Sequence, residues 1–116
     1  MTVHEFAQKN GYKILSSAKI AEAASIKGVY VCDMLSHAMA NVKDGDMWIT
    51  VHTNINIVAV ALLTNASCIA IPENISVDKI TLDKAAEENI TIISSPHSAY
   101  EICARFYLQT SEHCHG

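Results

Sequence analysis

Apolar and β-branched residues stand in short blocks along the chain, and each block ends in a polar turn. Continuous apolar blocks of this length are typical of strands that are buried on both faces. Between the blocks, apolar positions recur at helical spacing, as at Ile55, Val58 and Leu62. The pattern predicts strands at 12–15, 28–32, 47–51, 67–71 and 91–94, and helices at 3–10, 34–41, 54–64, 78–88 and 98–109.

Local signals mark the beginnings of two helices. Thr2 with Glu5, and Ser98 with Glu101, have the spacing of capping boxes, in which each side chain binds the backbone N–H of the other residue. The stretch 16–25 is rich in alanine, but its apolar residues form no clear stripe. We interpret it as a loop.

Strands and helices alternate with short links, which predicts an α/β fold with a parallel sheet. We expect a single domain at residues 1–110, with two or three layers. In this domain, helices flank a mostly parallel sheet of four or five strands. The remaining residues, 111–116, are expected to form a flexible tail.

The composition points to self-association. Hydrophobic residues make up 50% of the 116 residues and charged residues only 17%, whereas about 25% of an average domain is charged. A domain of this size cannot bury all of its apolar surface, and monomers rarely expose large apolar patches. We therefore expect a homo-oligomer, and specifically a dimer.

Charge and the absence of targeting segments exclude several classes of partner. The formal net charge is −4 and the basic residues are scattered, which argues against nucleic acid and against anionic membranes. No apolar run is long enough to cross a membrane, and the N-terminus lacks the pattern of a signal peptide. The four cysteines form no CxxC pair. These features predict a cytoplasmic protein with free thiols.

Polar side chains collect where the predicted strands end and the next helices begin. In a parallel sheet these carboxyl ends lie along one edge, where α/β proteins usually bind ligands and where helix N-termini attract anions. We therefore predict that a small ligand, anionic or nucleotide-like, binds at this edge. The candidate residues are Asp33, His52, Thr53, Asn54, Asn56, Glu73, Asn74, Ser95 and His97.

Helix capping is the main alternative, because it accounts for Asp33, Thr53 and Ser98 without any ligand. It does not account for the two histidines at the same edge, nor for Asn56 and Glu73. The site therefore stays open between ligand binding and capping.

Two groups of residues have the chemistry of metal ligands. His52 and His97 could bind a metal together with Cys32 or Glu73, but no CxxC or HExxH spacing supports such a site. Glu112-His113-Cys114-His115 is better explained as a tail that binds metal adventitiously. We predict no metal centre, and the sequence identifies no cofactor.

The motifs of common catalytic sites are missing. The chain has no GxSxG, no GxGxxG and no P-loop, and Cys32 has no evident base beside it. We therefore expect a protein that is not an enzyme.

The stretch GVYVCDMLSHAMANVKDGDMWITVHTNINIVAVALL, with ASCIAIPENISVD and ISSPHSAYEIC after it, resembles the DRTGG domain family. The resemblance is strongest to short stand-alone members. In larger proteins this domain precedes the catalytic domain of HPr kinase/phosphorylase-like proteins, or occurs in long phosphotransacetylases and between the CBS domains of some pyrophosphatases. The resemblance implies a regulatory or assembly module, often at a dimer contact. Because stand-alone members are often encoded beside iron-hydrogenase subunits, it also implies a redox-enzyme subunit as partner.

The chain departs from this family at the signature residues. The family's Asp-Arg pair falls at Thr53-Asn54, and its Thr-Gly-Gly falls at Pro72-Glu73-Asn74. The loss of arginine removes an anion-pairing group, and the loss of two glycines removes a close backbone approach. We predict weaker phosphate binding or a different ligand. Two functions remain: a ligand-sensing regulatory module, and a structural adaptor or dimerisation protein beside a hydrogenase-type enzyme.

Overall fold

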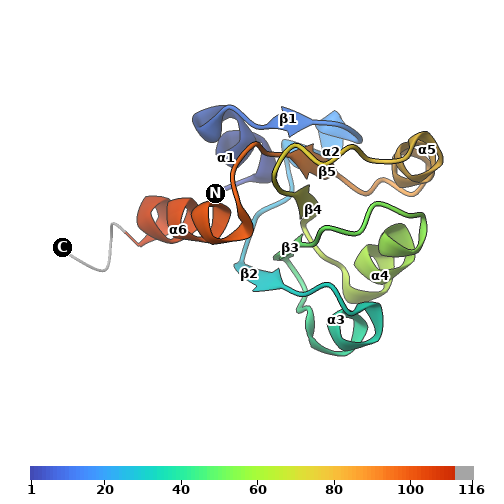
Figure 1. The fold of residues 1–116 in the computed structure, drawn as a ribbon. Coiled ribbons are helices and arrows are strands. Elements are labelled where there is room, and N and C mark those ends of the chain that lie inside the picture. Colours follow the sequence, from blue (N-terminus) through green and yellow to red (C-terminus); the bar gives the residue numbers. More distant parts are fainter. Residues whose placement is uncertain (112–116) are drawn as a thin grey trace.

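Five strands form one sheet through the middle of the protein (Figure 1). The computed structural model describes residues 1–111. The sheet has the order β1-β5-β4-β3-β2. The strands are β1 (Lys13–Ile14), β2 (Gly28–Val31), β3 (Asp46–Ile49), β4 (Cys68–Ile71) and β5 (Ile92–Ser94). Strands β2 to β5 run parallel, whereas β1 is antiparallel to β5 and places Lys13 beside Ser94. The predicted, mostly parallel sheet is confirmed.

Helices cover both faces of this sheet. They are α1 (Val3–Asn10), α2 (Ala18–Ala21), α3 (Leu35–Asn41), α4 (Asn56–Thr64), α5 (Lys79–Glu87) and α6 (Ala99–Thr110). Successive strand residues point to opposite faces, so Met47 joins a core with residues of α1, α2 and α6, and Trp48 joins a core with residues of α3, α4 and α5. The sheet is the middle of three layers, and the predicted α/β fold class is confirmed.

Both predicted capping boxes are present. The Thr2 hydroxyl accepts a hydrogen bond from the Glu5 N–H, and the Ser98 hydroxyl accepts one from the Glu101 N–H. In each box the glutamate side chain accepts a hydrogen bond from the backbone N–H of the capping residue. These bonds lower the pKa of the Glu5 and Glu101 carboxyls, because they stabilise the charged form.

One prediction of local structure was wrong, and two caps that the alternative interpretation required are absent. The stretch 16–25 contains the short helix α2, whose Ala21 is buried in the core. Asp33 does not cap α3, because its side chain binds residues at the end of β3 instead. Thr53 does not cap α4, which begins after Ile55 without a side-chain cap.

Within residues 1–111, no helix is both long enough and apolar enough to cross a membrane. The predicted tail from Glu112 onward, with its group of possible metal ligands, lies outside the described residues.

Candidate functional site

The carboxyl ends of the four parallel strands lie along one edge of the sheet, and the start of β1 lies there too. Strand β1 is antiparallel to β5, so its first residue pairs with the last residue of β5. Lys13 therefore reaches the same edge as the turns that follow β2, β3, β4 and β5.

The turns after β2 and β3 are joined through Asp33. Its Oδ1 accepts hydrogen bonds from the Thr50 hydroxyl at 3.0 Å and from the Val51 N–H at 2.9 Å. The Thr50 hydroxyl in turn accepts a hydrogen bond from the His52 N–H, and the His52 ring bonds the backbone oxygen of Asp33. These contacts bring two predicted site residues, Asp33 and His52, together, and they fix the path of the chain at the end of β3.

Three further predicted residues, Thr53, Asn54 and Asn56, make hydrogen bonds that stabilise the turn between β3 and α4. Asn54 Oδ1 accepts a hydrogen bond from the Asn56 N–H at 3.0 Å, and the Thr81 hydroxyl donates to the Thr53 backbone oxygen at 2.7 Å. The Asn54 side chain is thus used inside its own turn, and the second contact ties the turn to α5.

A second group forms at the ends of β4 and β5. Glu73 and Asn74 both have left-handed backbones, with φ of 59° and 55°. The Glu73 N–H donates to the His97 backbone oxygen, and the Asn74 N–H donates to the Ser95 backbone oxygen, both at 2.9 Å. The Ser95 hydroxyl accepts a hydrogen bond from the His97 N–H. Four predicted site residues, Glu73, Asn74, Ser95 and His97, therefore meet here, in two turns that are joined by hydrogen bonds.

Tyr12 completes this second group, and the sequence analysis missed it. Its hydroxyl lies 2.8 Å from His97 Nδ1, and the two rings pack edge to face at 5.5 Å. Burial raises the pKa of the Tyr12 hydroxyl. No sequence signal links these two residues, because they are 85 positions apart and meet only when β1 joins the sheet beside β5.

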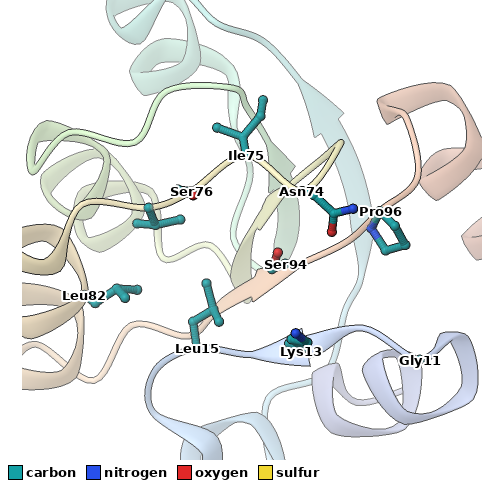
Figure 2. A pocket seen from close by; sticks show the side chains of 10 residues that line it. Gly11, Lys13, Leu15, Asn74, Ile75, Ser76, Leu82, Ser94 and Pro96 are labelled. Carbon is teal, nitrogen blue, oxygen red and sulfur yellow. The ribbon is translucent and has the colours of Figure 1, made fainter.

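A cavity of about 470 Å³ opens beside the Glu73–Asn74 turn (Figure 2). Figure 2 shows Leu15 and Leu82 on one side of it and Asn74 and Pro96 on the other, with Ser94 between them. The lining residues are Gly11, Lys13, Leu15, Asn74, Ile75, Ser76, Val77, Leu82, Ser94 and Pro96. Among the described residues that line this cavity, Asn74 is the only predicted site residue and Lys13 is the only cationic one.

The predicted site residues thus separate into two groups, one around Asp33 and His52 and the other around Asn74 and His97. Among the described residues, no hydrogen bond joins these two groups. The same part of the chain holds no cluster of three or more His, Cys, Asp or Glu side chains arranged to bind a metal ion.

A family model described as the DRTGG domain matches residues 5–107. The chain belongs to the DRTGG domain family. The resemblance seen in the sequence is therefore confirmed. A comparison with curated proteins gave no match.

Three solved chains match this DRTGG domain. One of them holds the CBS and DRTGG domains of the regulatory region of Clostridium perfringens pyrophosphatase, complexed with its activator, diadenosine tetraphosphate. The two chains share 16% identity with a TM-score of 0.66, a likeness that extends to the fold alone. The match covers 87% of this chain but only 44% of the pyrophosphatase chain. Neither the description of the family model nor the matched pyrophosphatase mentions a redox enzyme, so the hydrogenase-linked role stays a prediction from the resemblance.

Proposed function

We propose that this DRTGG domain is a non-catalytic regulatory module that binds a small anionic, nucleotide-like ligand in the cavity beside the Glu73–Asn74 turn. The observation that carries the proposal is the lining of that cavity. The Lys13 ammonium and the side chains of Asn74 and Ser94 supply polar contacts at the carboxyl edge of the sheet. The family membership supports a regulatory role, and the regulatory region of the neighbour is complexed with a nucleotide activator.

The size and chemistry of the cavity narrow the class of ligand. Its volume of about 470 Å³ falls in the range of roughly 300–1,000 Å³ for small-molecule sites. Leu15, Ile75 and Leu82 offer an apolar wall for a flat ring, whereas Lys13 offers one positive charge. A ligand with a single phosphate fits this lining better than a polyphosphate, because further phosphates would find no cation among the lining residues.

This proposal assigns different roles to the nine site residues that were predicted from the sequence. Asn74 would contact the ligand, and Glu73, Ser95 and His97 would position its turn. Asp33, His52, Thr53, Asn54 and Asn56 would shape the neighbouring turns, as their hydrogen bonds within the protein suggest. Asn54→Ala should therefore leave affinity nearly unchanged.

The experiment measures thermal unfolding against inorganic phosphate, AMP, ATP and diadenosine tetraphosphate. A ligand at about 100 times its dissociation constant raises the free energy of unfolding by about 2.7 kcal/mol, which shifts the Tm of a domain this size by several degrees. We expect AMP to bind more tightly than diadenosine tetraphosphate.

Paired variants locate the site. Lys13→Met keeps a long side chain but removes the charge, and Asn74→Gly removes the amide while allowing the left-handed backbone. Each should weaken AMP binding at least tenfold. Lys19→Met changes an exposed lysine on α2, outside the cavity, and is the matched control. If no compound shifts the Tm, or if Lys13→Met binds as tightly as the control, the proposed site is wrong.

A further inference from the structure

Helix α6 has an apolar face that no other part of the described chain covers. Only Ile102 of its twelve residues is fully buried, and Figure 1 shows the helix extending to one side of the sheet. Tyr100, Tyr107 and Leu108 are 80%, 64% and 66% exposed. With Ala104 they stand at positions i, i+4, i+7 and i+8, which is one continuous face of a helix.

The opposite side of α6 already faces the core. Ile102 is buried there, and Ala99, Cys103 and Phe106 pack against the same cluster. Phe106 makes an edge-to-face contact with Phe6 at 5.6 Å. The exposed stripe is therefore not an inward face that has failed to pack. It is a second apolar face on a helix whose inward side is satisfied.

We infer that this α6 face binds the same face of a second copy, in an antiparallel helix pair. The two tyrosines are placed symmetrically along the helix, because Tyr100 and Tyr107 are equally far from the midpoint between Cys103 and Ala104. A two-fold axis at that point places each Tyr100 beside Tyr107 of the other copy. The small Ala104 lies at the crossing point, where it permits a close approach of the two backbones.

The charges on the helix fit the same arrangement. Glu101 and Arg105 are adjacent on one flank of the stripe, one turn apart. In an antiparallel pair, equivalent flanks face each other, so each Glu101 comes beside Arg105 of the other copy. Arg105 Nη1 donates to Asn10 Oδ1 at 3.2 Å, and Glu101 Oε1 accepts a hydrogen bond from the Ser98 N–H, so both charges are held on this flank. A parallel pair would lack this complementarity.

The available area places the dimer among small interfaces. Tyrosine side chains bury ~150–250 Å² each, so the exposed parts of Tyr100, Tyr107 and Leu108 supply roughly 400 Å² per copy. With the flanking side chains, two copies bury about 1,000 Å², at the low end of specific interfaces. We therefore expect a weak dimer with a dissociation constant in the micromolar range.

The test is sedimentation velocity of the full chain over a range from about 1 to 500 µM. The wild type should form a dimer in this range, and Leu108→Glu should raise the dissociation constant at least tenfold. Leu63→Glu is the matched control, because Leu63 is an exposed leucine of α4 with 70% exposure. Arg105→Glu tests the orientation, since it would place carboxylates together across the pair; Lys19→Glu is its control.

Each outcome decides the inference. A wild type that stays monomeric at the highest concentration overturns it. A dimer that survives Leu108→Glu, or that is weakened as much by Leu63→Glu, forms through another surface. A dimer that is weakened by Leu108→Glu but not by Arg105→Glu is not the antiparallel pair. Because α6 contributes no residue to the cavity, a failed ligand screen would leave this result unaffected.

Discussion

Ser16 gives the sharpest test of how this sheet is held together. Its side chain is buried, and its hydroxyl donates to the Ile90 backbone oxygen at 2.8 Å while it accepts a hydrogen bond from the Ile92 N–H at 3.0 Å. One hydroxyl thus connects the segment after β1 to the beginning of β5. Ser16→Ala removes both hydrogen bonds without adding bulk.

The expected loss of stability comes from two backbone groups, the Ile90 carbonyl and the Ile92 N–H, which lose their hydrogen-bond partner. A buried polar group that loses its partner costs about 1–3 kcal/mol, and this substitution leaves one donor and one acceptor. We expect a loss of about 3 kcal/mol in the free energy of unfolding. Because small domains are stable by only about 5–15 kcal/mol, the loss should lower the Tm by roughly 10 °C.

Urea unfolding followed by the fluorescence of Trp48 measures this loss directly. Trp48 is the only tryptophan of the chain and is fully buried, so its emission reports global unfolding. Ser36→Ala is the control, because Ser36 is an exposed residue of α3. A change below about 0.5 kcal/mol for Ser16→Ala, with the same dependence on urea, would show that the two backbone groups find other partners.

Three further predictions test other features. Burial raises the pKa of the Cys68 thiol to about 12, so this thiol ionises at lower pH in the unfolded chain than in the folded one. The free energy of unfolding should therefore fall above about pH 9, by up to ~1.4 kcal/mol per pH unit. In urea titrations at several pH values, Cys68→Ala should show a smaller fall of this free energy with pH. Ser98→Ala removes the cap of α6 and should cost about 1 kcal/mol in the same assay, whereas an unchanged midpoint would mean the cap is dispensable. Glu73→Gly should stabilise the domain by about 0.5 kcal/mol, because relief of the left-handed backbone outweighs the added chain entropy; a loss of stability would refute this.

The features that could be predicted from sequence are those set by neighbouring residues. The capping boxes at Thr2 and Ser98 depend on a partner three residues away, and both formed as expected. The buried strands were visible because blocks such as Met47 to Ile49 are apolar at every position, which only a sheet covered on both faces requires.

The features that could not be predicted depend on contacts between distant residues. Asp33 has the residue type and position of a helix cap, but a partner 17 residues away, Thr50, takes its carboxylate. The position of Lys13 at the carboxyl edge could not be predicted, because nothing in the local sequence shows that β1 runs antiparallel to β5. The short helix α2 has too few residues to show a periodic stripe, and Ala21 anchors it only once the core has formed.

The Glu73–Asn74 turn has a backbone conformation that glycine adopts most readily, although neither residue is glycine. The sequence resemblance aligns these two positions with the family's paired glycines, and both have the left-handed backbone that glycine adopts freely. Asparagine tolerates this conformation, but glutamate does not favour it. The turn is therefore imposed by its surroundings, through the hydrogen bonds to the backbone oxygens of Ser95 and His97. Where the family has two glycines, this chain has the side chains of Glu73 and Asn74 at this edge, so the ligand that we propose should differ from one that needs a bare backbone there.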